Sequence, residues 1–142
     1  MSKRLANIDN LVSLRDGVRK RTAILEKDGQ IKIRLCMGGG CIASGSNDVH
    51  WAFVNELDKA KIDMFQCQLH KTGCLGPCSG GPALFIGDTF YELVKPEDVA
   101  ELVQEHILGG RVVERLLHKK PDGSRAEKEQ DIDFFKIQNK IV

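Results

Sequence analysis

The chain has 142 residues, of which 42% are hydrophobic and 29% charged, which is enough for one compact domain with its own core. Twenty-one basic and twenty acidic residues leave a net charge of +1, so nothing indicates nucleic-acid binding. The N-terminus lacks the apolar stretch of a secretory signal, and no later run reaches the roughly 18 apolar residues of a membrane span. We therefore expect a soluble, cytoplasmic protein without direct membrane contact.

The first half of the sequence predicts a leading helix followed by a strand, a helix and a strand. Residues 8–26 carry leucines and valines near helical spacing among basic residues, which we interpret as a solvated helix face, and 27–29 is a turn. Apolar residues alternate in 30–36 and 64–69, as in half-buried strands. The helix predicted between them, over 46–60, makes this a βαβ unit that should be right-handed.

The second half predicts a hairpin and another helix. Strands are expected at 83–86 and 90–94, joined by a tight turn, and a helix is expected from 95 to about 108, since Pro96 and two following acidic residues suit a first helical turn. The order of elements is that of an α/β thioredoxin-like sandwich, with a mixed sheet covered by helices.

We expect three segments: a leading helix and turn over 1–29, the thioredoxin-like domain over 30–110, and a linker or extended arm over 111–142. The arm is predicted because 118–130 is polar and contains Pro-Asp-Gly, without any apolar period. Apolar residues return from Ile132 to Val142, which suggests that the parent protein continues beyond this point.

Four of the five cysteines stand in two glycine-rich segments. Cys36 and Cys41 lie in CMGGGCIASG, a C-x4-C spacing, and Cys74 and Cys78 lie in GCLGPCSGGP, a C-x3-C spacing. Each segment follows one strand of the βαβ unit, and these strand ends lie at the same edge of the sheet. We therefore expect all four sulfurs to converge on one point.

Several chemistries compete for these cysteines. An odd number of cysteines in a reducing compartment argues against a disulfide framework. Structural zinc accepts four cysteines at such spacings, whereas a thiol-redox enzyme would need a C-x-x-C pair, which the sequence lacks. Glycine-rich loops let backbone N–H groups approach thiolate sulfur, which favours an iron-sulfur cluster. Chance burial of four small hydrophobic residues in two such loops is the remaining alternative.

The other candidate residues are given structural interpretations. Cys67 alternates with Phe65 and Leu69 on one face of a strand and is predicted to be a core residue. His70 has no second histidine placed to make a Rieske-type pair, so a strand-end or surface position is expected. Trp51 and Phe53, on the helix of the βαβ unit, are expected in the core.

The cysteine segments, together with HKTGCLGPCSGGPALFIGDTFYELVKPEDVAELVQEHILGG and the terminal DIDFFKIQNKIV, resemble a known family. They look like the N-terminal thioredoxin-like [2Fe-2S] ferredoxin domain of the flavoprotein (beta) subunit of NADH-dependent multimeric [FeFe]-hydrogenases and bifurcating oxidoreductases, related to the flavoprotein subunit of complex I. The resemblance covers about residues 31–142. The cysteine segments fit any thioredoxin-like ferredoxin, and the terminal segment is the more discriminating part.

The resemblance implies a [2Fe-2S] cluster and one-electron transfer, as a relay module of an NAD(P)H-linked flavin and iron-sulfur oxidoreductase. Its partners would be a flavin/NADH-binding domain and other iron-sulfur subunits, and FMN and [4Fe-4S] clusters belong to a part downstream of Val142. The chain would not be an enzyme by itself. All-cysteine coordination suggests a potential of roughly −400 mV by comparison with plant-type ferredoxins. The alternative is a structural zinc-binding interaction module of a larger complex.

Overall fold

The computed structural model describes residues 7–27 and 29–138, which belong to two compact units. One unit contains helix α1 (Ile8–Lys27), which confirms the predicted leading helix, and the other spans residues 31–138. Asp28 of the predicted turn and the apolar residues Ile141 and Val142 lie outside the described residues. Among the described residues, no helix is both long and apolar enough to cross a membrane.

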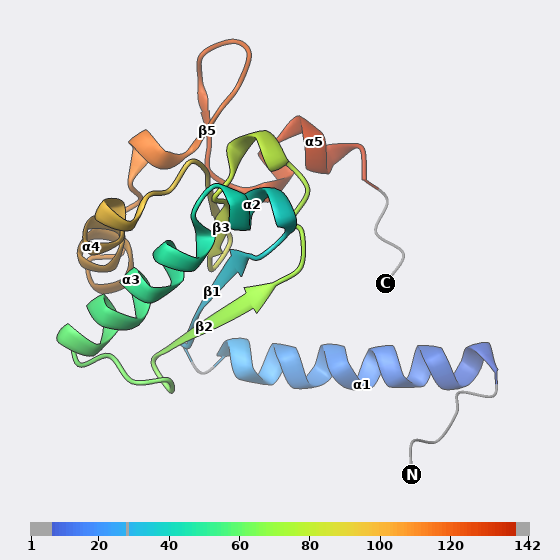
Figure 1. Ribbon diagram of the computed structural model, residues 1–142. Coiled ribbons are helices and arrows are strands. Elements are labelled where there is room, and N and C mark those ends of the chain that lie inside the picture. Colours follow the sequence, from blue (N-terminus) through green and yellow to red (C-terminus); the bar gives the residue numbers. More distant parts are fainter. Residues whose placement is uncertain (1–6, 28, 139–142) are drawn as a thin grey trace. The chain divides into compact units, whose positions relative to one another are not determined.

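The larger unit is built on a four-stranded mixed sheet in the order β2-β1-β3-β4 (Figure 1). Strands β1 (Ile31–Cys36) and β2 (Cys67–Thr72) are parallel and are connected through α2 (Gly39–Ala43) and α3 (Ser46–Lys59). Strands β3 (Leu84–Ile86) and β4 (Thr89–Tyr91) form an antiparallel hairpin beside β1. The predicted βαβ and ββα units and the thioredoxin-like fold are confirmed.

The hairpin turn and the following helix agree with their local sequence. Gly87 takes a left-handed conformation, with φ 59°, in the two-residue turn between β3 and β4. The helical segment after β4 runs through η2 (Pro96–Asp98), α4 (Val99–Glu101) and the wider π-helical η3 (Leu102–Leu108). The Asp98 carboxylate accepts a hydrogen bond of 2.9 Å from the backbone N–H of Lys95 and so caps this segment.

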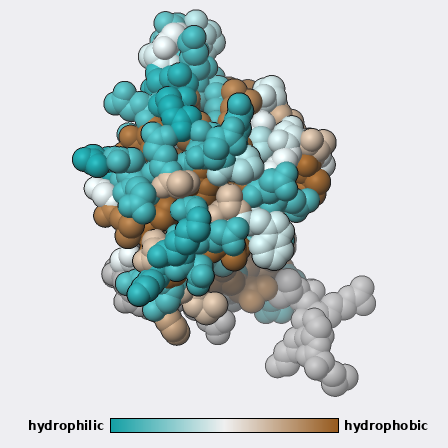
Figure 2. Space-filling view, turned by 60° about the vertical axis from the view of Figure 1, so that its left-hand side comes forward, coloured by the Kyte–Doolittle hydropathy of each residue, from teal (hydrophilic) through white to brown (hydrophobic). Residues whose placement is uncertain are grey.

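Side-chain alternation along the strands divides the interior into two cores. Ile33 and Leu35 of β1, and Leu84 and Ile86 of β3, face the side covered by α3 and α4 and lie in the main buried cluster. Their neighbour Phe85 points to the opposite face, into a second buried cluster. Both faces of the central strands are therefore buried, as expected for a three-layer arrangement. Figure 2 shows the helix-covered side, where hydrophilic residues dominate and hydrophobic residues form small patches between them.

The second core is closed by the segment that follows residue 110, where we expected a linker or an extended arm. This segment contains η4 (Glu114–Leu116), the short strands β5 (His118–Lys119) and β6 (Arg125–Ala126), η5 (Glu129–Asp131) and α5 (Asp133–Lys136). It bridges to the edge strand at Tyr91↔Leu117 and Thr89↔Lys128, and the Phe90 N–H donates to the Glu127 carbonyl at 2.8 Å.

Residues 111–138 are therefore packed into the same unit as the sheet, which differs from the expected arm. The physical reason is that a few separated apolar residues anchor an otherwise polar segment, so no helical or strand period is visible in the sequence. The buried anchors are Val113, Leu116, Leu117, Ala126, Ile132 and Phe135.

Three further expectations about single residues have different outcomes. Cys67 is 4% exposed and packs in the main core, as predicted. Phe65 does not share its face, because β2 begins only at Cys67 and Phe65 is 77% exposed ahead of the strand. On α3, Phe53 is fully buried as expected, but Trp51 is 61% exposed, because a helix directs positions two apart to different faces.

Candidate functional site

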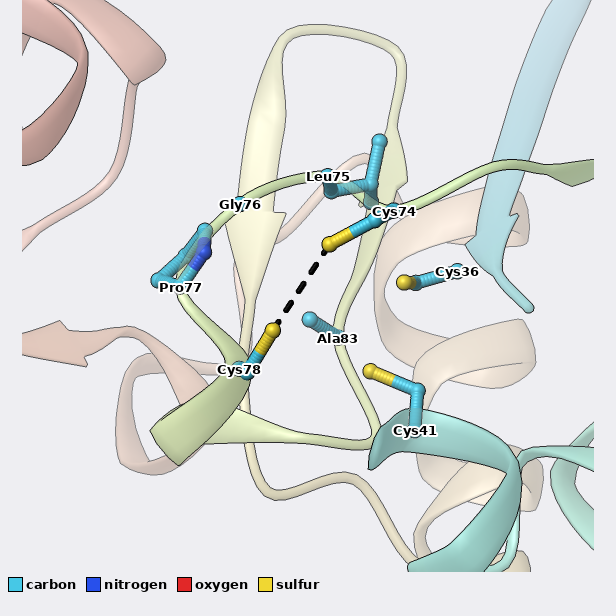
Figure 3. A pocket seen from close by; sticks show the side chains of 8 residues that line it. All are labelled: Cys36, Cys41, Cys74, Leu75, Gly76, Pro77, Cys78 and Ala83. Atoms are coloured by element: carbon cyan, nitrogen blue, oxygen red, sulfur yellow. Dashed lines mark hydrogen bonds between the residues drawn. The ribbon is translucent and has the colours of Figure 1, made fainter. Parts of the chain in front are cut away.

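The four cysteines singled out in the sequence line one pocket (Figure 3). Cys36 is the last residue of β1 and Cys41 lies in α2, whereas Cys74 follows β2 and Cys78 begins η1 (Cys78–Gly80). The remaining lining residues, Leu75, Gly76, Pro77 and Ala83, carry no polar side-chain atom. Among the described residues that line the pocket, the side-chain donor atoms are thiol sulfurs alone.

The convergence follows from the parallel pairing of β1 and β2. Cys36 is paired in register with Thr72, so the chain leaves both strands at the same edge of the sheet. The Met37 N–H donates to the Thr72 carbonyl at 2.9 Å, and this extends the pairing into the two glycine-rich segments. A Cβ atom on Gly38 would lie 3.1 Å from the Cys74 Cβ atom, so glycine allows the segments to approach closely.

The two cysteine segments present their sulfurs differently. Cys36 and Cys41 are 2% and 3% exposed and belong to the second buried core, whereas Cys74 and Cys78 are exposed. The Cys74 and Cys78 sulfurs lie 3.6 Å apart. Two thiolates bound to one tetrahedral metal at about 2.3 Å are separated by roughly 3.7 Å, so this pair already has the spacing of two ligands on one metal.

The first glycine-rich segment is a short helix rather than the expected loop. The Ile42 N–H donates to the Gly38 carbonyl at 2.9 Å, and the Ser44 hydroxyl donates to the Gly40 carbonyl at 2.9 Å. These local hydrogen bonds pair the carbonyl groups of Gly38 and Gly40 and so order a segment that its glycines would otherwise make flexible. Cys41 is thereby fixed in the first turn of α2, and its sulfur points into the pocket from the same side as that of Cys36 (Figure 3).

Hydrogen bonds make the Cys36 thiol the more acidic of the two buried cysteines in the pocket. Burial by itself raises the pKa of Cys36, but backbone N–H groups of Gly38 and Leu75, with the Cys41 and Cys74 thiols, outweigh it and lower this pKa. N–H groups directed at sulfur are the donors that stabilise thiolate charge in an iron-sulfur site.

The pKa values of Cys41 and Cys78 are raised. Burial raises the pKa of Cys41 to about 11, although the Ala83 N–H donates to its sulfur. The exposed Cys78 has its pKa raised first by its hydrogen bond with Cys74 and then by the charge of that neighbour. Raised pKa values disfavour thiolate at Cys41 and Cys78, and a metal ion bound between the sulfurs would favour it.

The remaining candidates lie outside the pocket. Cys67 is buried in the main core, where burial raises its pKa to about 11, and it does not line the pocket. His70 is exposed on β2, and its ring lies 2.9 Å from the Gln68 side-chain oxygen. The structure thus brings together the four predicted cysteines and keeps Cys67 and His70 apart from them. Ala83, whose N–H meets Cys41, had no signal in the sequence.

Comparison with known proteins identifies the class of site. Residues 23–106, more than half of the chain, match the thioredoxin-like [2Fe-2S] ferredoxin family. The chain belongs to this family. A [2Fe-2S] cluster is accordingly its cofactor, and electron transfer through this cluster is its function. The pocket fits such a cluster, since it offers four thiols, directed N–H groups and otherwise apolar walls.

Two curated relatives agree with this membership. The chain is similar to the 2Fe-2S ferredoxin of Aquifex aeolicus, with 36% identity over 84 residues that cover 58% of this chain and 76% of the relative. It is also similar to the 2Fe-2S ferredoxin of Clostridium pasteurianum, with 35% identity over 80 residues that cover 55% and 78% of the two chains.

A solved structure gives the same result for the fold. The crystal structure of the thioredoxin-like [2Fe-2S] ferredoxin from Aquifex aeolicus superposes with a TM-score of 0.58 at 30% identity, covering 64% of this chain and 98% of that chain. The family match ends at residue 106, so the packed segment over 111–138 lies beyond it. These comparisons support the ferredoxin family and do not extend to membership in a hydrogenase subunit.

Proposed function

We propose that Cys36, Cys41, Cys74 and Cys78 hold the [2Fe-2S] cluster of this ferredoxin. The observation that supports this most is that two strand ends bring these four thiols, and no other donor side chain, to a single pocket. When bound, the cluster accepts and returns one electron. The thiolates supply its negative charge, and their segments fix where that charge lies in the protein.

The two sides of the pocket differ in exposure and are proposed to have different roles. On the buried side, Cys36 and Cys41 exclude water, and the N–H groups of Gly38, Leu75 and Ala83 stabilise thiolate charge. On the other side, Cys74 and Cys78 are exposed. An electron partner would therefore approach at the Cys74–Cys78 loop, where the exposed thiols of the pocket lie.

At a finer level, we propose that the chain is the relay module of an NAD(P)H-linked flavin and iron-sulfur oxidoreductase of the hydrogenase or NADH dehydrogenase type. The support is the resemblance of the segment from Asp131 to Val142 to the lead-in of a flavin/NADH domain. The partners are then that flavin/NADH-binding domain and other iron-sulfur subunits. The chain alone transfers electrons and does not transform a substrate.

Cysteine substitutions in the holoprotein test the ligand assignment. Cys74→Ser should abolish or disturb the visible spectrum of the cluster, because it removes an exposed ligand that nothing else in the pocket replaces. Cys67→Ala is the matched control, since this cysteine is buried in the main core, and its spectrum should remain intact. The opposite pattern would show that the ligand set is wrong.

A reduction assay tests the finer proposal. Dithionite should bleach the purified holoprotein, whereas NADH should bleach it only after a flavoprotein subunit of an NADH-dependent oxidoreductase is added. Reduction by NADH without any flavoprotein would contradict the view that the chain is only a relay. A colourless protein that holds one zinc ion would instead support the interaction-module alternative.

A further inference from the structure

The short helix α5 lies against the face of the sheet that adjoins the cysteine pocket. Phe135 is 8% exposed and belongs to the same buried cluster as Cys36 and Cys41. Its ring centroid lies 6.1 Å from that of Phe85 and 5.7 Å from that of Phe90, the latter in an edge-to-face arrangement. These contacts hold α5 on the second core, in a part of the chain beyond the family match.

From this position the preceding residue reaches the Cys74–Cys78 loop. A Cβ atom built on Gly76 would overlap the Cε1 atom of Phe134 and lie 2.6 Å from its Cζ atom, so the ring rests directly on the glycine backbone. Gly76 also has φ +118°, a backbone conformation that residues with a side chain rarely adopt. Phe134 is 39% exposed, which means that its ring stands between this backbone and solvent.

The loop under the ring carries both exposed cysteines and a hydrogen-bond donor for a buried one. Gly76 lies midway between Cys74 and Cys78, and the N–H of the adjacent Leu75 donates to the Cys36 sulfur. The Leu75 N–H belongs to the peptide unit that joins Cys74 to Leu75, so a ring that restrains Gly76 limits movement of this unit from one residue away. Contact at one glycine can therefore affect the positions of three thiols.

We propose that Phe134 is a positioning residue for the iron-sulfur site, in that its ring clamps the Cys74–Cys78 loop at Gly76 and limits opening of the cluster to solvent. This inference rests on the proposed ligand set. Phe135 fixes α5 in the second core, and the contact between Phe134 and Gly76 holds the loop against this fixed helix. A segment outside the family match thereby becomes part of the cluster environment.

Cluster release from the anaerobic holoprotein tests the clamp. With an excess of an iron chelator, Phe134→Ala should lose its visible absorbance roughly tenfold faster than the wild type, and Phe134→Leu should be intermediate because it restores part of the contact. Ile137→Ala is the matched control, since this neighbouring side chain is 86% exposed, and its rate should be unchanged. The reduced Phe134→Ala protein should also show a broadened or shifted electron paramagnetic resonance spectrum, which a general loss of stability would not produce.

A double-mutant cycle locates the effect at the loop. In the wild-type background, Gly76→Ala should speed cluster release, because the added methyl displaces the Phe134 ring as well as straining the backbone. In the Phe134→Ala background the same substitution should have a smaller effect, since only the backbone strain remains. Additive effects would overturn the clamp.

The possible failures are distinguishable. A wild-type protein without iron and sulfide would refute the proposed function, and the clamp with it. A wild type with a cluster, combined with wild-type release rates and spectra in Phe134→Ala, would refute the clamp alone. If Phe134→Ala does not fold, Phe134→Leu decides, because wild-type behaviour in that variant would equally overturn the proposal.

Discussion

Replacing Phe135 by alanine tests whether residues 111–138 are structural. The side chain is 8% exposed and its ring meets those of Phe85 and Phe90, so truncation removes aromatic contacts on the sheet face opposite α3. Truncation of a buried phenylalanine costs about 3–5 kcal/mol, and the partial exposure favours the lower end of that range. For a chain of this length, about 3 kcal/mol corresponds to a fall of about 10 °C in the midpoint of thermal unfolding.

The assay is thermal unfolding of the anaerobic holoprotein, followed by far-ultraviolet circular dichroism at one fixed scan rate. Iron content is measured before each scan, so that a loss of cluster is not mistaken for a loss of packing. Ile137→Ala is again the control, and as an exposed substitution it should change the free energy of unfolding by less than about 0.5 kcal/mol. If Phe135→Ala behaves like this control, the segment is an arm after all and the packing argument is refuted.

Three further predictions concern other parts of the site and fold. Tyr91→Phe should lower the free energy of unfolding in urea by about 1–3 kcal/mol, because the hydroxyl of the fully buried Tyr91 accepts a hydrogen bond from the Val113 N–H at 3.2 Å. An unchanged free energy of unfolding would contradict this role. Arg115→Ala should lower the free energy of unfolding by at most about 1 kcal/mol, since the Arg115 side chain is 52% exposed, and the effect should shrink in high salt. In the apoprotein, Cys36, whose pKa is lowered, should reach its maximal alkylation rate at a lower pH than Cys41, whose pKa is about 11; mass spectrometry that finds the reverse order would contradict the hydrogen-bond assignment.

The sequence predicted the pocket because its signals are local and the topology is simple. Two strands with alternating apolar residues, joined by a helix, must be parallel neighbours, so the segments after Cys36 and Thr72 had to meet. The same alternation assigned Cys67 to the core correctly. Periodicity failed at two single positions. Placing Trp51 correctly would have required the orientation of its helix, and placing Phe65 would have required the exact first residue of β2.

The packing of residues 111–138 had no comparable signal. Between His118 and Gln130 only Ala126 is a buried apolar residue, so composition alone indicates a solvated linker. The segment is ordered by tertiary contacts instead: bridges to β4 and the burial of Ile132 and Phe135 under the sheet. Contacts of this kind depend on a partner surface formed elsewhere in the chain, and no local pattern encodes them.

Quantification of iron and acid-labile sulfide in the anaerobically purified chain, with its spectrum before and after dithionite, tests the central claim most directly. The account predicts iron and sulfide in equal amounts, about two of each per chain, and a rhombic electron paramagnetic resonance signal on reduction. A colourless chain with a single zinc ion and no sulfide would contradict it.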